Sequence, residues 1–151
     1  MLRARAIHES LGQAPIDVRR EVDGFILNRL QIALLTEAFR LVQEGCVTPQ
    51  DLDRTIRDGL GLRWSFMGPF ETIELNAPAG IPDYCARFEG MYRPMAQNPP
   101  PERVWDKATI DRIVADWGKA LTPDQVRSKS RWRDERLAAL VAHKKGQPKA
   151  G

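Results

Sequence analysis

The stretch that decides the fold is Gly24-Phe25-Ile26-Leu27-Asn28-Arg29-Leu30, which opens a mostly apolar run that extends to about Glu44. At about 100° per residue, polar and apolar residues of this run fall on opposite sides, as in an amphipathic helix. The polar side carries Arg29, Thr36, Glu37, Arg40, Gln43 and Glu44. The apolar side carries Leu27, Leu30, Ile32, Leu34, Leu35, Ala38, Phe39, Leu41 and Val42. The pattern predicts one long helix with a buried face.

Two amides, Asn28 and Gln31, lie inside the apolar arc. We expect both to be buried, and a buried amide without a hydrogen-bond partner costs roughly 1–3 kcal/mol. Two interpretations stay open. In the first, each amide binds a neighbouring backbone group, as most buried polar groups do. In the second, Asn28 faces a substrate or a catalytic group at a seam between domains.

The bulk composition indicates an ordinary globular domain. The chain has 151 residues, of which 42% are hydrophobic and 28% charged, a balance typical of soluble proteins. No stretch reaches the roughly 20 apolar residues of a membrane span, and the N-terminus lacks the apolar core of a signal peptide. The two cysteines, Cys46 and Cys85, are far apart and show no metal-ligand spacing. We therefore expect free thiols, no bound metal and a cytoplasmic location.

The positive charge is concentrated near the C-terminus. Residues 119–151 contain nine basic and three acidic residues, whereas the preceding residues carry a net charge of −3. Such a segment could contact nucleic acid. A solvated helix face is the simpler interpretation, because Arg131 and Glu135 stand at the i,i+4 spacing of an intrahelical ion pair. We expect no nucleic-acid partner.

Helix signals divide the rest of the chain. Asp23 is placed to cap the long helix and Gly45 to end it. Thr48-Pro49 and Thr122-Pro123 are cap-and-proline starts, and Gly59 and Gly61 are expected to break the helix that follows Thr48. Helices are thus predicted over about 3–11, 24–44, 49–58, 69–76, 81–95, 110–117 and 123–144. The fold class is all-α, with a lead-in at residues 1–22, a helical domain at 23–145 and a frayed tail at 146–151.

One segment of the lead-in is predicted to be a strand. Ile16-Asp17-Val18-Arg19 alternates apolar and polar residues after Pro15, which is the strand period. A lone strand cannot satisfy its own backbone groups. Either this segment pairs with another copy of the chain, or the sheet to which it belongs is missing, which suggests a chain cut from something larger.

Several enzyme classes lack their motifs. The sequence contains no Gly-x-Gly-x-x-Gly turn and no phosphate-binding loop, so no cofactor is expected to bind this chain. Its two histidines, His8 and His143, lie near the termini and are expected on the surface. The carboxylates of Asp51, Asp53 and Asp58 are expected on a solvated helix face rather than in a general-acid pair. The segment Trp64-Ser65-Phe66-Met67 could line a pocket or a partner surface, although core packing is the default.

Several short motifs, taken in their order along the chain, nevertheless resemble those of a known protein family. The opening heptapeptide is followed by Glu37-Ala38, Glu44-Gly45, Asp51-Leu52-Asp53, Gly59-Leu60-Gly61, Gly68-Pro69 and Glu71. In this order and spacing they resemble the C-terminal domain of the L-3-hydroxyacyl-CoA dehydrogenases. With Trp132-Arg133-Asp134-Glu135, the wider pattern is most similar to the branch that contains lambda-crystallin (L-gulonate 3-dehydrogenase). The resemblance covers roughly residues 3–140.

The resemblance implies a divided active site in an oxidoreductase of the fatty-acid-metabolism type. In that family an N-terminal Rossmann domain binds NAD and supplies a catalytic His–Glu pair and a serine, none of which has a counterpart here. The helical C-terminal domain completes the substrate cleft and forms a homodimer. Residues 1–22 then correspond to a helix–strand remnant of the end of a Rossmann domain. Asn28 matches the asparagine that reaches substrate and the catalytic histidine, and Gln31 and Leu27 would shape the wall.

The interpretation that follows is a substrate-binding and dimerisation domain that is catalytically incomplete by itself. It would meet a 3-hydroxyacyl-CoA or 3-hydroxyacid substrate only together with a Rossmann domain. A stand-alone helical interaction module, or one subunit of a split enzyme, is the alternative.

Overall fold

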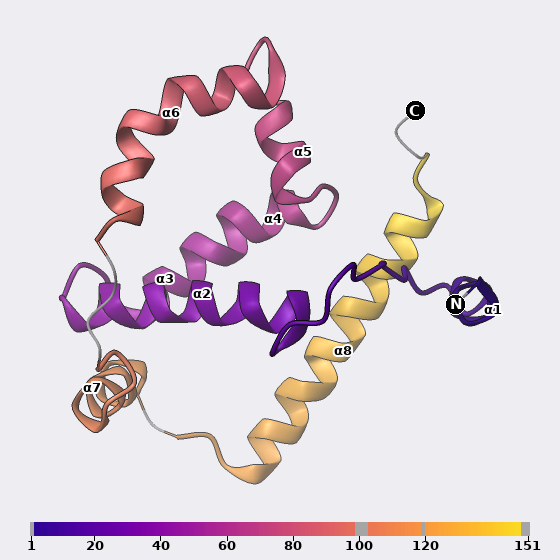
Figure 1. Cartoon of the computed structure of the whole chain (residues 1–151). Coiled ribbons are helices and arrows are strands. Elements are labelled where there is room, and N and C mark those ends of the chain that lie inside the picture. The colour runs from indigo at the N-terminus through magenta and orange to yellow at the C-terminus, as the bar shows by residue number, and fades with distance from the viewer. Residues whose placement is uncertain (1, 99–102, 119, 149–151) are drawn as a thin grey trace. The chain divides into compact units, whose positions relative to one another are not determined.

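The chain is all-α in the computed structural model, which describes residues 2–98, 103–118 and 120–148. The described part contains no strand, and no helix there is long and apolar enough to cross a membrane. In chain order (Figure 1) the elements are α1 (Leu2–Ser10), α2 (Phe25–Gln43), α3 (Pro49–Thr55), the π-helical turn η1 (Ile56–Leu60), α4 (Gly61–Trp64), α5 (Pro69–Glu74), α6 (Gly80–Ala96), α7 (Lys107–Trp117) and α8 (Pro123–Gly146). The predicted fold class is confirmed.

The chain forms two units, Met1–Glu37 and Ala38–Gly151, and the division falls within α2. In the first unit, the strand prediction for residues 16–19 is wrong: residues 13–18 have no regular secondary structure. Arg5 of α1 holds this segment instead, because its guanidinium lies 2.6 Å from the Asp17 carboxylate and donates to the Pro15 carbonyl oxygen at 3.4 Å. With no second strand beside it, the segment has no partner for a ladder.

The second unit has a small buried cluster around the C-terminal half of α2. Val42 and Val104 are only 4% and 2% exposed, and the rings of Phe39 and Trp105 contact each other at a tilt of 36°, with centroids 4.2 Å apart. Arg112 of α7 donates to the Gln43 carbonyl oxygen at 2.8 Å, where the end of α2 leaves acceptors unpaired. This contact joins the end of α2 to α7, and α3 also packs against α7.

Local sequence signals set most helix ends. Gly45, at φ 74°, closes α2, and the amides of Gly45 and Cys46 donate to the Val42 and Leu41 carbonyls, which is the Schellman pattern. Thr48 caps α3 through the Asp51 amide, and Thr122 forms a capping box with Gln125 at the start of α8. These three predictions are confirmed.

Two predicted helix signals do not act as expected, although α2 itself lies within one residue of its predicted bounds. The Asp23 carboxylate makes no hydrogen bond among the described residues. Instead, α2 starts from two successive left-handed residues, Gly24 and Phe25, with φ of 76° and 49°. Gly59 and Gly61 do not end the helix that starts at Pro49, because the chain passes through η1 directly into α4. The missing side chain of Gly61 permits this turn, since a Cβ there would lie 2.9 Å from the Ile56 carbonyl oxygen.

A buried glycine connects α5 to α6. Gly80 has φ 72°, and a Cβ at this position would lie 2.5 Å from both carboxylate oxygens of Glu74. Glu74 uses that position to accept a hydrogen bond of 2.7 Å from the Ile81 amide, in the first turn of α6. A carboxylate there also interacts favourably with the helix dipole. The start of α6 therefore depends on a glycine at position 80.

We predict that Gly80→Ala destabilises the chain by about 2–3 kcal/mol, from left-handed strain and loss of the Glu74 cap. The matched control is Gly90→Ala in the same helix, where nothing lies within 4 Å of the added Cβ. That substitution should stabilise by about 0.5–1 kcal/mol. Urea denaturation of both variants measures the difference, and equal effects would contradict the role given to Glu74.

Candidate functional site

The predicted site residues lie on the first turns of α2. Leu27, Asn28 and Gln31 are all exposed, Leu27 to 75%. Asn28 and Gln31 are three residues apart, so their amides are neighbours on one side of the helix. Leu30 and Ile32, which are 61% and 50% exposed, border them. The result is a pair of amides set in an uncovered apolar surface.

The prediction that these amides are buried is wrong for this chain by itself. Between Phe25 and Leu35 the apolar side of α2 is mostly exposed, and only Leu34 is half-buried. The side predicted to be solvated is half-buried at four positions, namely Thr36, Glu37, Arg40 and Gln43. Neither amide makes a hydrogen bond among the described residues. The interpretation in which each amide binds a neighbouring backbone group therefore has no contact in the structure to support it.

The backbone that presents Asn28 is strained. Phe25 is the one non-glycine residue with positive φ in the described part of the chain. A left-handed conformation is unusual for a bulky residue, and strain of this kind concentrates at functional sites. Gly24 precedes it at φ 76°, and a Cβ there would lie 3.6 Å from the Cβ of Asn28. The composition of the heptapeptide did not reveal this conformation of Phe25.

The other titratable candidates do not assemble into catalytic pairs. Within the described ranges, no group of His, Cys, Asp or Glu could hold a metal ion. His8 lies 2.5 Å from the Gln13 side chain, and His143 meets the edge of Phe66 with centroids 6.4 Å apart. No His–carboxylate ion pair occurs in the described residues. Neither histidine thus has the acid partner that a general base of the expected kind needs.

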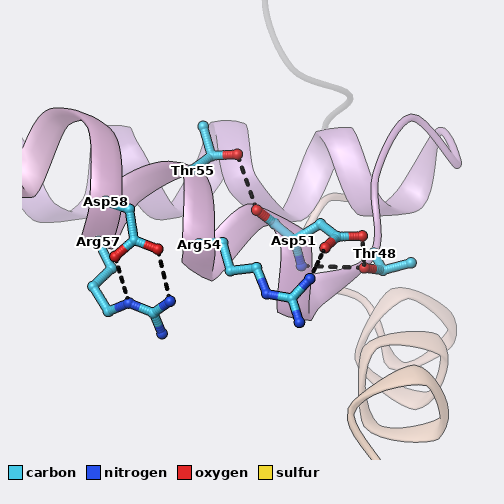
Figure 2. A network of polar contacts seen from close by, with 6 residues as sticks. All are labelled: Thr48, Asp51, Arg54, Thr55, Arg57 and Asp58. Atoms are coloured by element: carbon cyan, nitrogen blue, oxygen red, sulfur yellow. Dashed lines mark hydrogen bonds and ion pairs between the residues drawn. The ribbon is translucent and has the colours of Figure 1, made fainter.

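Asp51, Asp53 and Asp58 are exposed, as predicted, and Asp51 and Asp58 also form surface ion pairs. Arg54 donates to the Asp51 carboxylate at 2.8 Å, and Arg57 donates to both carboxylate oxygens of Asp58 at 2.8 and 2.7 Å. Figure 2 shows these side chains along one side of α3 and η1. The hydrogen bond from Arg57 is the main reason that the pKa of Asp58 falls below its ordinary value. A carboxyl group held ionised in this way is a poor general acid. Because all of these side chains are exposed, they form a solvated helix face.

Aromatic residues gather at two further places. Trp64 and Phe66 are 41% and 57% exposed, so the default expectation of core packing for that segment is wrong within this chain. On α6, Tyr84, Phe88 and Tyr92 follow one another at four-residue steps. The hydroxyls of Tyr84 and Tyr92 are hydrogen-bonded at 2.7 Å. The sequence pattern showed the apolar stripe of α6 but not this bond between residues two turns apart.

The motifs quoted above lie in a region that matches a known protein family. Residues 24–113 match the family model of the 3-hydroxyacyl-CoA dehydrogenase C-terminal domain. A lambda-crystallin homologue from Mus musculus is 42% identical over 144 residues, which are 93% of this chain and 44% of the relative. Lambda-crystallin from Oryctolagus cuniculus is 42% identical over 147 residues, 95% of this chain and 45% of that protein.

L-carnitine dehydrogenase from Pseudomonas aeruginosa is 40% identical over 140 residues, 91% of this chain and 43% of the relative. The chain thus spans somewhat less than half the length of these curated relatives. The matched range contains the strained start of α2, both amides, η1 and the aromatic stripe of α6. This chain belongs to the 3-hydroxyacyl-CoA dehydrogenase C-terminal domain family.

Proposed function

We propose that the chain is the substrate-binding part of an NAD-dependent 3-hydroxyacyl-CoA or 3-hydroxyacid dehydrogenase and is catalytically incomplete by itself. One observation carries this proposal: in a member of this family, the uncovered start of α2 presents Asn28 and Gln31 with neither amide engaged. An apolar surface that carries unpaired amides is suited to the interface between two domains. There the second domain buries the apolar side chains, and a substrate provides hydrogen-bond partners for the amides.

The residues of this chain do not fit NAD. A dinucleotide is held where a glycine-rich turn follows a strand and opens a helix. The sequence lacks that turn, and the described residues form no strand that could precede it. When bound to a Rossmann domain, NAD would accept hydride from the substrate carbon. No residue of this chain would donate or accept the hydride.

The proposed part of this chain in the reaction is positioning. The Asn28 side chain offers one acceptor oxygen and two donor hydrogens. It can therefore donate to the substrate oxygen while its own oxygen accepts from a histidine N–H of the Rossmann domain. Gln31, one turn further along α2, would contact the substrate beside it. Leu27 and Leu30 would exclude water, which strengthens hydrogen bonds in the closed seam.

We further propose a homodimer, located in the cytoplasm, with no nucleic-acid partner. The dimer is supported by the large apolar residues that the second unit leaves uncovered, Phe70 at 73% and Leu75 at 67% among them. Apolar exposure of this kind marks interaction surfaces. The basic helix α8 pairs part of its charge internally, through Arg127 with Asp124 and Arg133 with Asp134. These pairs support a solvated helix face.

The proposal predicts that the isolated chain neither binds NAD nor oxidises a hydroxyacyl substrate. Calorimetric titration with NAD should show no saturable heat, and 3-hydroxybutyryl-CoA with NAD should yield no NADH. Adding a separately expressed Rossmann domain from a relative should restore NADH formation. Micromolar NAD binding by the isolated chain would contradict the proposal that NAD is bound by a separate Rossmann domain. If no related Rossmann domain restored activity, a stand-alone interaction module would be favoured.

We predict opposite consequences for stability and turnover from Asn28→Leu. The isolated chain should lose no stability, because the amide has no partner there to lose. The complemented enzyme should lose roughly 10²-fold or more in kcat, as expected for one hydrogen bond to the transition state. Arg29→Leu, on the solvated side of the same helix, is the matched control and should leave kcat near normal. A destabilised but fully active Asn28→Leu variant would make Asn28 a structural residue.

A further inference from the structure

The start of α2 carries a bulky side chain on an unfavourable backbone conformation. Phe25 has φ 49°, and Gly24 before it has φ 76°, so two successive residues are left-handed. Glycine adopts this conformation freely, and asparagine tolerates it, whereas the Cβ of other residues crowds the neighbouring carbonyl oxygen. On local backbone energy alone, glycine or asparagine is therefore the better residue at position 25.

The contacts of Phe25 within the chain do not offset this strain. Phe25 is 56% exposed, and no other aromatic ring lies against it in the described ranges. Its amide donates to the Val22 carbonyl oxygen at 3.0 Å, but glycine or asparagine at this position would make the same bond. The phenyl ring is thus the one group at position 25 that these residues could not replace, and its contact must lie outside the part of the chain that the structure describes.

The strained turn lies directly against Asn28. A Cβ on Gly24 would lie 3.6 Å from the Asn28 Cβ and 3.8 Å from the Arg29 Cγ, which is van der Waals contact. Phe25 is three residues before Asn28, so its ring leaves the chain within one turn of the amide. Strained residues persist at active sites and ligand clamps, where the strain holds a group ready for its ligand. The strain here adjoins the residue proposed to hold the substrate oxygen.

The side chains around Phe25 are suited to an uncharged alkyl chain. Between Gly24 and Leu35 the one charged residue is Arg29, so a cationic substrate group would find no carboxylate in this stretch. Ile26 and Ile32 are 43% and 50% exposed. The hydroxyls of a polyhydroxylated chain would lose hydrogen bonds to water against such a surface. An alkyl chain would lose only unfavourable contact with water and would gain dispersion contacts.

We propose that Phe25 is a specificity-determining residue, whose ring contacts the alkyl tail of a 3-hydroxyacyl substrate while Asn28 binds the hydroxyl oxygen. The left-handed backbone holds the ring beside the amide before substrate binds, which lowers the ordering cost of binding. The contact with the alkyl tail supplies the interaction that the ring lacks in this chain. The substrate class is thereby narrowed to 3-hydroxyacyl groups whose tail is an unsubstituted alkyl chain.

This inference rests on the proposed function, because it needs a substrate at Asn28, but the two fail in different ways. NADH formation by the wild-type chain with a Rossmann domain tests the proposed function. The ratio between Phe25 variants and wild type tests the role of the ring. If no Rossmann domain restored NADH formation, both would be wrong. If wild type were active and the ring-deleted variants matched it, only the role given to Phe25 would be wrong.

The first measurement is urea denaturation of the isolated full chain carrying Phe25→Gly or Phe25→Asn. Both substitutions remove the ring and leave the left-handed conformation accessible. The unfolding midpoints should equal or exceed that of wild type, because strain is relieved and little burial is lost. A loss of about a hundredfold or more in the folding equilibrium constant of both variants, as for a ring deleted from a core, would make Phe25 a structural residue and overturn the proposal.

The second measurement compares 3-hydroxybutyryl-CoA with 3-hydroxyhexanoyl-CoA as substrates of the complemented enzyme. Both ring-deleted variants should raise KM for the longer substrate by about tenfold or more and raise it less for the shorter one. Their kcat should stay near normal, because a contact made equally in the ground state and the transition state changes KM alone. Phe25→Tyr keeps the ring and is the matched control, with KM near wild type for both substrates. Equal changes for the two chain lengths, or a loss confined to kcat, would overturn the proposal.

Discussion

Burial of the apolar side chains of α2 is the constraint on which the other features of this molecule depend. At the C-terminal half of the helix, Val42 is 4% exposed and the Phe39 ring contacts that of Trp105, so this part is anchored within the second unit. At the N-terminal half, Leu27 and Leu30 are 75% and 61% exposed. One helix with a continuous apolar side therefore begins in solvent and ends in a core. Burial of apolar area is the main favourable term in folding, so the uncovered half calls for a partner.

The features predicted correctly from sequence are those decided within a few residues. The left-handed Gly45, the Thr48 cap and the Thr122 capping box each involve groups less than one and a half turns apart, so the identity of neighbouring residues is enough to specify them. The predictions that failed required knowledge of distant groups. Strand formation at residues 16–19 needs a second strand, and burial of Asn28 needs a covering surface. The helical period correctly gives the side on which a residue lies, but it cannot say whether that side is covered.

Other features were missed because competing local conformations decide them. Gly59 and Gly61 predicted the end of a helix. In the structure, however, the missing side chain of Gly61 allows the chain to pass through a π-helical turn. Asp23 reads as an N-cap, yet the left-handed Gly24 and Phe25 start α2 without using its carboxylate. In both cases the residue types permit more than one local conformation. The choice between them belongs to the packing of the whole chain.

The state of the polar groups distinguishes the two uncovered apolar faces. On α2 the amides of Asn28 and Gln31 have no hydrogen-bond partner among the described residues, so dry cover alone would cost free energy there. A suitable occupant must bring its own donors and acceptors, as a substrate and a catalytic domain do. On α6 the phenols of Tyr84 and Tyr92 share one hydrogen bond, which uses one of their two O–H donors. The two faces therefore differ in their polar groups: α2 presents two amides without a partner among the described residues, whereas α6 presents two phenols that are already bonded to each other.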